Sequence, residues 1–240
     1  MHIALAAEPV MITVSDDRNK VIFDGKWSFY TEWKRSSLDT LSYDDGTLMY
    51  LRTAHQGNFI YIFIDVVSET KFNKNNDMAY VCFDKHDVRP MIANQDDYCF
   101  LVPLGKDSFV LQGGSPLQET GNFKKISNPD GFIGVGSISD ENDRYTSIPH
   151  PSYEFKIPTE VVGRSDAYGF YVGVYDSHVN KIYSWPQDIV VSLLRIPSPN
   201  QWGELISPDR SLPEFGSIVG WITAISLIGS LVISRRFSKV

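Results

Sequence analysis

The sequence contains few cysteines and few basic residues. Its 240 residues include two cysteines, which excludes a disulfide-rich scaffold, and no Cys/His cluster has the spacing of a structural zinc site. The 22 Lys and Arg residues are outnumbered by 29 Asp and Glu, and they form no basic cluster. Because phosphate backbones are bound by clustered Lys and Arg, this charge balance excludes nucleic acid as a partner.

Catalytic signatures are also missing from the sequence. It has no G-x-S-x-G, H-E-x-x-H, Walker or dinucleotide-binding glycine pattern. The acidic pairs Asp16-Asp17, Asp44-Asp45 and Asp96-Asp97 resemble glycosidase carboxylates in type, but their turn-rich context is more typical of solvated turn residues. We therefore expect a protein that is not an enzyme.

Short apolar runs bounded by Gly, Pro, Asn and Asp make up most of the chain. Hydrophobic residues account for 42% of the sequence, and 13 Pro and 17 Gly interrupt it, which favours short strands over long helices. The runs predict eleven strands: Val10–Val14, Val21–Phe23, Leu48–Arg52, Asn58–Val67, Met78–Asp84, Tyr98–Pro103, Phe109–Gln112, Phe132–Gly136, Tyr153–Ile157, Tyr168–Tyr175 and Ile189–Leu194. Helical turns are predicted at Ser36–Leu41 and Thr159–Gly163.

This spacing of strands and turns predicts one all-β domain over residues 9–197. We expect an antiparallel β-sandwich, a two-sheet fold of the immunoglobulin or jelly-roll kind. Tyr168–Tyr175 and Asn58–Val67 are apolar on both faces. We therefore place these two strands at the centres of their sheets.

An uncharged apolar segment lies near the end of the sequence. Residues 217–234 carry no charge and are followed by a basic tail, residues 235–240. At about 1.5 Å per residue the segment is about 27 Å long, close to the roughly 30 Å of a bilayer's hydrocarbon core. It predicts one transmembrane helix after a Pro-punctuated linker, residues 198–216, with the tail in the cytoplasm and the domain outside. A buried core helix is the alternative.

An exported domain needs a signal segment, and the sequence begins with a fragment of one. Residues 1–8 contain the small-residue pattern found at the end of a signal peptide, but their hydrophobic part is too short. We interpret them as a residual or truncated signal segment.

The two cysteines fit an exported protein. Cys82 and Cys99 lie in two strand-like runs joined by a polar loop, so they could pair across neighbouring antiparallel strands. An oxidising compartment would permit this disulfide. Two buried free thiols are the alternative.

The order of several short blocks resembles a known family. The blocks are FDGKW at Phe23–Trp27, Glu32-Trp33, NDMAYVCFD at Asn76–Asp84, DDYCFLV at Asp96–Val102, YEFKIP at Tyr153–Pro158, and YGFYVGVYD followed by SWP at Ser184–Pro186. They are similar to the DOMON-like relatives of family 9 carbohydrate-binding modules. The resemblance implies a β-sandwich over roughly residues 20–195, with the ligand held between two tryptophans.

The end of the sequence resembles a second pattern. LPEFG at residues 212–216, followed by the apolar segment and Arg235-Arg236, is similar to the PEF-type sorting tails of exported archaeal proteins. This resemblance implies that an archaeosortase-like enzyme recognises Pro213, Glu214, Phe215 and Gly216 and moves the domain to a surface anchor. A plain C-terminal membrane anchor is the alternative.

Sugar binding without catalysis needs a flat aromatic ring and planar hydrogen-bonding side chains. Trp33 and Trp185 lie at the edges of strand-like segments between polar residues, and we expect them to be exposed ligand-binding rings. Core packing is the alternative for either ring, and it is the expectation for Trp27. Hydrogen bonds to the sugar are assigned to Arg52, Gln56, Asn58 and Asn94.

Two cofactors come into consideration. Calcium is the better candidate, because Asp84 and Asp97 flank the two cysteines and their oxygens suit a hard cation, although turn capping is the alternative use. Some DOMON relatives hold haem through Met and His or Lys. The histidines here are scattered and no ligand pair is singled out, so haem is not expected.

These patterns predict an exported domain that recognises a polysaccharide or surface glycan without catalysis. We place it on the extracellular face of the membrane or at the cell surface, anchored by its C-terminal segment. A structural component of the cell envelope or surface layer without sugar affinity is the main alternative. A haem-binding DOMON domain for electron transfer is a third.

Overall fold

In a computed structural model, the described part of the chain folds almost entirely into strands. It comprises residues 7–187, 189 and 194–208. The strands are β1 (Val10–Met11), β2 (Thr13–Val14), β3 (Ser37–Ser42), β4 (Leu48–Gln56), β5 (Phe59–Asp65), β6 (Met78–Asp84), β7 (Asp97–Pro103), β8 (Phe109–Gln112), β9 (Lys124–Ile126), β10 (Ile133–Ile138), β11 (Pro151–Pro158), β12 (Ala167–Asp176), β13 (Lys181–Trp185) and β14 (Gly203–Ile206). One turn of α-helix, α1 (Thr159–Val162), follows β11 as the sequence predicted.

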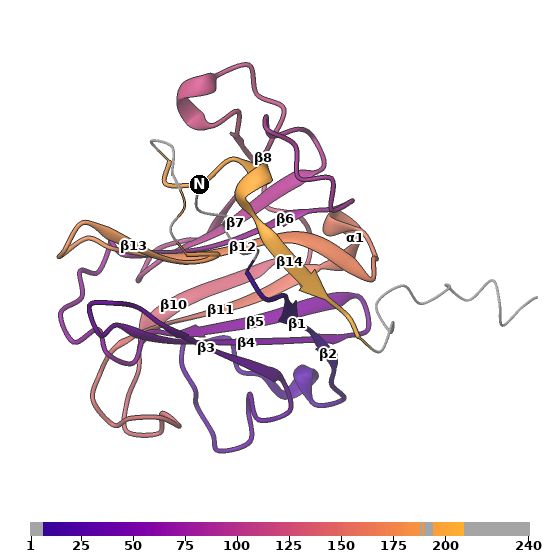
Figure 1. Cartoon of the computed structure of the whole chain (residues 1–240). Coiled ribbons are helices and arrows are strands. Elements are labelled where there is room, and N and C mark those ends of the chain that lie inside the picture. Colours follow the sequence, from indigo (N-terminus) through magenta and orange to yellow (C-terminus); the bar gives the residue numbers. More distant parts are fainter. Residues whose placement is uncertain (1–6, 188, 190–193, 209–240) are drawn as a thin grey trace, which may run out of the picture.

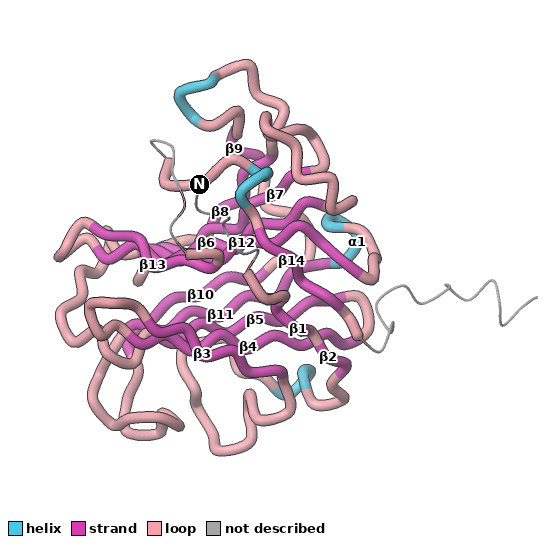
Figure 2. The backbone as a smooth tube through the Cα atoms, viewed as in Figure 1, coloured by secondary structure: helices cyan, strands magenta, loops and turns pink. Residues whose placement is uncertain are grey.

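The strands form two sheets that are stacked face to face (Figure 1). Sheet A has the order β1-β14-β12-β6-β7-β8-β9, and β13 pairs with the C-terminal half of β12. Sheet B has the order β10-β11-β5-β4-β2, and β3 also pairs with β4. Loops, with few helical turns, connect the strands (Figure 2). The expected all-β, two-layer fold is confirmed for these residues, and β12 and β5 both lie inside their sheets.

The sheets are mixed, which corrects the expectation of purely antiparallel pairing. β1 runs parallel to β14 in sheet A, and β2 runs parallel to β4 in sheet B. The run Val10–Val14 therefore forms an edge of both sheets. Between its two short strands, the backbone N–H of Ile12 donates to the carbonyl of Ile206 at 2.9 Å. This segment runs in the same direction as β14 and as β4, so both of its pairings are parallel.

The main core lies between the sheets and follows the two-residue period of the strands. In β6, Ala79, Val81 and Phe83 point into this core, whereas Tyr80 and Cys82 point to the outer face of sheet A. A second apolar cluster on that outer face includes Trp202 and Phe123, which lie in loops that fold over it. Both faces of sheet A are therefore covered around β6, which explains its continuous apolar sequence.

A long loop, residues 16–36, covers the outer face of sheet B. It places Trp27 and Trp33 against Tyr61 and Phe63 of β5. Gly25 in this loop has a φ of +79°, and a Cβ there would lie 2.6 Å from the backbone nitrogen of Ser137. Glycine is therefore required at this position by conformation and by space. Trp27 is buried, as the sequence predicted.

The structure differs from the predictions in four respects. Ser36–Leu41 is not helical, because Ser37–Ser42 pairs with β4 through an antiparallel register that runs from Ser37–Thr53 to Ser42–Leu48. Val21–Phe23 forms no strand and belongs to the loop over sheet B. β9 and β13 were not predicted. The domain does not end at residue 197, because β14 pairs with β12 and β1 inside sheet A.

The disulfide prediction is confirmed. Cys82 and Cys99 face each other in the register of β6 and β7, with a Cα–Cα distance of 4.0 Å, and their sulfurs are bonded. Both residues are fully buried on the outer face of sheet A.

Several predictions fall outside the described residues. These are the transmembrane helix at 217–234, the motif Pro213–Gly216, the basic tail at 235–240, most of the signal segment at 1–8 and most of the strand at Ile189–Leu194. Among the residues that are described, no helix has the length and apolar character needed to cross a membrane.

Candidate functional site

Trp33 is buried, so the expectation of an exposed ring is wrong. Its ring stacks on Phe63 with centroids 5.3 Å apart, and the Arg18 guanidinium lies 5.2 Å from the ring centroid. The indole N–H donates to Oε1 of the buried Glu154 at 3.0 Å. Because protein atoms cover the ring, it cannot stack on a sugar. It anchors the loop at 16–36 to sheet B.

Trp185 is also buried, with 7% of its surface exposed. It lies in the main core, where its ring is 5.9 Å from that of Phe170. A Cβ at Gly203 would lie 2.3 Å from the Trp185 ring, so the ring packs directly against the backbone of β14. The signal that sequence reasoning missed is the glycine of β14, which leaves room for this ring.

The predicted hydrogen-bonding residues are not brought together. Arg52 is buried under the loop at 16–36, where Nε donates to the Tyr145 hydroxyl at 2.9 Å. Gln56 bonds backbone groups of the same loop. Asn58 is exposed at the turn between β4 and β5, and Asn94 is exposed in the loop between β6 and β7. These four residues form no common site.

Asp84 and Asp97, the predicted calcium pair, face each other across β6 and β7. Each also accepts hydrogen bonds from the loop between these strands: Asp84 from the N–H groups of His86 and Arg89, and Asp97 from that of Asn94. Burial, partly offset by the bond from Asn94, raises the pKa of Asp97 to about 7. The observed bonds are those of turn capping, and calcium at this pair stays a prediction.

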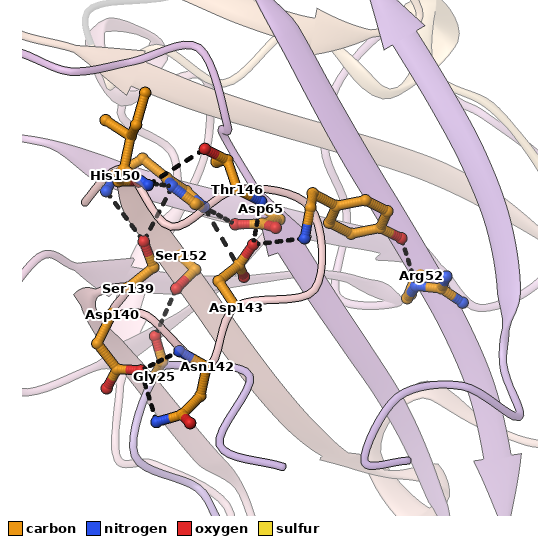
Figure 3. Close-up of polar contacts among 12 residues, drawn as sticks. Gly25, Arg52, Asp65, Ser139, Asp140, Asn142, Asp143, Thr146, His150 and Ser152 are labelled. Carbon is orange, nitrogen blue, oxygen red and sulfur yellow. Dashed lines mark hydrogen bonds and ion pairs between the residues drawn. The ribbon is translucent and has the colours of Figure 1, made fainter. Parts of the chain in front are cut away.

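A buried histidine joins the ends of β5, β10 and β11 (Figure 3). His150 Nε2 is 2.6 Å from Oδ1 of Asp65, and Nδ1 is 2.7 Å from the carbonyl of Ile148 and 2.9 Å from Oγ of Ser139. His150 and Asp65 are fully buried. Burial opposes the charged imidazole, but the hydrogen bond and charge of Asp65 outweigh it and raise the pKa of His150.

Ser139, His150 and Asp65 are the residue types of a Ser-His-Asp triad, but His150 cannot act here as the general base for the serine. The carbonyl of Ile148 can only accept, so Nδ1 donates to it and has no lone pair free for Ser139. The imidazole therefore cannot act as the base that takes a proton from Ser139. The geometry is that of a buried ion pair that ties the loop at 139–150 to sheet B.

An exposed groove lies beside Tyr175, near the C-terminal end of β12. It consists of two hollows of about 420 and 430 Å³ that share Tyr175 and Arg195. The Arg195 guanidinium lies 3.6 Å from the centroid of the Tyr175 ring. We call this feature the Tyr175 groove; its lining is Asn73, Asn75, Asn76, Met78, Tyr175, Ser177, Asn180, Lys181, Ile182, Ser184, Ile189 and Arg195.

The polar lining of the Tyr175 groove is rich in amides. Asn73, Asn75, Asn76 and Asn180 are all exposed there. The Tyr175 hydroxyl donates to Oδ1 of Asn180 at 2.8 Å. An aromatic ring surrounded by planar donors and acceptors is the side-chain chemistry that suits a sugar. The sequence pointed to tryptophans, whereas the structure assembles this chemistry around a tyrosine.

Three carboxylates meet beside this groove. One oxygen from each of Glu69, Asp77 and Asp176 lies within 4.8 Å of the others, and all three residues are buried. Burial, followed by the charges of Asp176 and Asp77, raises the pKa of Glu69 to about 9. Sequence reasoning missed this cluster, because its members lie up to 107 positions apart.

Another cleft, of about 570 Å³, lies at the N-terminal end of β5. Phe59, Asn58, Arg164 and Glu160 are among its lining residues. Nη2 of Arg164 donates to Oδ1 of Asn58 at 2.7 Å, and Lys156 Nζ lies 4.1 Å from the Phe59 ring centroid. This Phe59 cleft thus places Asn58, a predicted binding residue, beside an aromatic ring.

Comparison with known proteins identifies the fold. Two solved structures of a family 9 carbohydrate-binding module from Caldicellulosiruptor kristjanssonii, one with cellotriose and one with glucose, are similar to this chain with a TM-score of 0.55. The identity is 12%, and the match covers 83% of this chain and 93% and 95% of the modules. No family model and no curated protein matches the sequence. The expected likeness to family 9 modules therefore holds at the level of the fold.

Proposed function

We propose that this chain is a non-catalytic glycan-binding domain and that the Tyr175 groove is its binding site. The observation that carries the proposal is the shared fold, which extends over 83% of this chain and belongs to modules solved with cellotriose and glucose. The ligand class is therefore an oligosaccharide or polysaccharide.

The Tyr175 groove supports this proposal through its chemistry. Its hollows of about 420 and 430 Å³ adjoin and have the size of ordinary ligand pockets. Arg195 covers one face of Tyr175, and the edge of a guanidinium carries N–H donors that suit sugar hydroxyls. The amides of the asparagines provide further donors and acceptors for sugar hydroxyls. The groove thus suits a sugar chain that lies along the surface.

Calorimetric titration of the full chain tests the proposal. The protein is purified in a mild detergent and titrated with cellotriose, glucose and a panel of other oligosaccharides. We expect Tyr175→Ala to weaken binding roughly tenfold, which corresponds to about 1.4 kcal/mol, because the aromatic surface and its bonded amide are lost. Phe59→Ala, which removes the ring of the other cleft, serves as the matched control.

The two variants separate the sites. Loss of binding in Phe59→Ala with normal binding in Tyr175→Ala would move the site to the Phe59 cleft. Absence of binding to every sugar, together with self-association of the wild-type chain, would favour a structural envelope protein.

We also propose that the domain is exported and anchored by its C-terminal segment. The uncharged run at 217–234, the PEFG motif at 213–216 and the disulfide between Cys82 and Cys99 support this localisation. We expect the full chain in the membrane fraction of expressing cells, with its domain digested by protease added to intact cells. A chain without residues 217–240 should leave the membrane fraction, and equal retention of both chains would contradict the anchor.

A further inference from the structure

We propose that Tyr30, Lys34 and Arg144 form a second binding site, which takes the carboxylate groups of an acidic sugar chain. Tyr30 and Lys34 lie in the loop at 16–36, which covers the outer face of sheet B, and Arg144 lies in the loop at 139–150. We call these three residues the Tyr30 patch. The Tyr175 groove is built on β6 and β12 of sheet A, so the two sites are separate.

The centre of the patch is an exposed aromatic ring with two cations on it. Tyr30 has 67% of its surface exposed. Lys34 Nζ lies 3.7 Å from the centroid of its ring, and the guanidinium carbon of Arg144 lies 5.5 Å from the same centroid. Attraction between a cation and the face of an aromatic ring favours both contacts. Two positive charges that are 110 positions apart in the sequence therefore meet at one exposed ring.

No carboxylate neutralises these two cations. Among the described residues, neither Lys34 nor Arg144 forms an ion pair. Three neighbours on the same loop do form one: Lys20 and Arg35 with Asp17, and Lys26 with Asp140. Because the whole chain carries a net charge of −7, the Tyr30 patch is a local site of positive charge on an acidic protein. Such a site attracts an anionic group that the rest of the surface repels.

A third cation lies behind the patch. The guanidinium carbon of Arg144 is 6.0 Å from the centroid of the Trp27 ring, and that of Arg52 is 5.2 Å from the same centroid. Arg52 is buried and donates to the Tyr145 hydroxyl and to the carbonyl of Trp33, which are uncharged acceptors. Water and salt screen a buried charge less than an exposed one. Arg52 therefore adds to the positive potential at the patch.

The backbone of the loop at 16–36 is held in place beneath the patch. The indole N–H of Trp27 donates to the carbonyl of Phe29 at 2.7 Å, directly before Tyr30. Lys34 directly follows Trp33, the buried ring that anchors this loop to sheet B. Both exposed residues of the loop thus project from buried neighbours.

The backbone around Arg144 is held as well. Oδ1 of Asp143 accepts from the N–H of Tyr145 at 2.8 Å and from that of Thr146 at 3.1 Å, so these bonds span Arg144 (Figure 3). The ring of Tyr145 stacks on that of Tyr50 with centroids 3.9 Å apart. Because the backbone of both loops is positioned before a ligand arrives, less conformational entropy is lost on binding.

The side chains of the patch suit a carboxylate. The exposed guanidinium of Arg144 can bind both oxygens of a carboxylate, and the ammonium of Lys34 and the hydroxyl of Tyr30 provide further donors. Lys34 covers a face of the Tyr30 ring, so the ring supports the cations and is not a stacking surface for a sugar. The sugar as carrier of the carboxylate rests on the proposed function, whereas the negative charge follows from the patch itself. The patch therefore selects a chain of uronic acids over its neutral counterpart.

Calorimetric titration of the full chain with trigalacturonate tests the patch, and the fully methyl-esterified trimer is the matched neutral ligand. We expect the acid to bind roughly tenfold more tightly than the ester, with an affinity that falls as sodium chloride is added. Lys34→Gln and Arg144→Gln should each weaken binding of the acid about fivefold, the effect of losing one exposed charge-assisted hydrogen bond. Arg35→Gln removes the adjacent exposed charge, which is paired with Asp17, and should bind the acid as wild type does.

Further measurements separate the patch from the Tyr175 groove. Tyr175→Ala should keep trigalacturonate binding, and Lys34→Gln should keep cellotriose binding and the wild-type melting temperature. Binding of trigalacturonate without binding of cellotriose would support the patch and contradict the groove. Absence of trigalacturonate binding, equal affinity for acid and ester, or equal weakening in Arg35→Gln would overturn the proposal. Binding to vesicles with anionic lipid in place of trigalacturonate would also overturn it and assign the patch to a membrane surface.

Discussion

His150 and Asp65 are fully buried and bonded to each other, so each determines the charge of the other. Removing one partner of such a pair leaves an uncompensated charge in the interior. We expect His150→Gln to lower the free energy of unfolding by about 3 kcal/mol at pH 6, as measured by urea denaturation. The exposed His178 provides the control, and His178→Gln should leave stability unchanged.

The same pair predicts how stability depends on pH. The pKa of His150 is raised above its usual 6.5. Its contribution to the free energy of unfolding is therefore complete below pH 6.5 and is lost as the pH rises through the folded-state pKa. Burial raises the pKa of Asp65 from 3.8 to about 6, so the native state retains a proton that the unfolded state releases, and stability also falls across that interval. The difference in free energy of unfolding between wild type and His150→Gln should therefore decrease from pH 6 to pH 9. A difference that does not change with pH would contradict the raised pKa of His150.

Among the elements, β6 and β7 are joined by the disulfide as well as by hydrogen bonds. The cysteines are 17 positions apart, and closing a loop of this length stabilises the fold by about 3 kcal/mol on the chain-entropy model. We expect dithiothreitol to lower the urea midpoint of the wild-type chain accordingly. The double variant Cys82→Ala and Cys99→Ala should be insensitive to dithiothreitol, and equal midpoints of wild type with and without reductant would contradict the prediction.

The elements differ in how well the sequence predicts them. β6 and β8 have the predicted bounds, because their apolar runs end at clear turn residues. Ser36–Leu41 was predicted as helical, whereas Ser37–Ser42 forms β3; SLDTLS is short and mostly polar, and its strand conformation depends on pairing with β4. β14 was missed for a similar reason, since GELI becomes a strand through β12 and β1. Edge strands take their conformation from partners that local sequence does not reveal.

For the whole molecule, the position of β14 determines where the folded domain ends. β14 covers Trp185 and provides the partner of β1. We expect a chain that stops at residue 197 to expose the core and fail to give a cooperative thermal transition, whereas a chain that stops at residue 208 should retain one. Circular dichroism melting measures both, and a cooperative transition in the shorter chain would show that β14 is dispensable.

The sequence by itself determined the two-layer β architecture and most strand positions, because alternation and turn residues act locally. It left the two cysteines as either a disulfide or free thiols, and the register of β6 and β7 decided for the disulfide. Only the tertiary structure decided which rings are covered. Trp33 and Trp185 have polar neighbours in sequence, yet Glu154, 121 positions from Trp33, and Gly203, 18 positions after Trp185, help to enclose them. The Tyr175 groove and the cluster of Glu69, Asp77 and Asp176 likewise arise where β6 and β12 meet. These sites depend on contacts between separate segments, about 100 residues apart for β6 and β12, and a single sequence does not specify which segments those are.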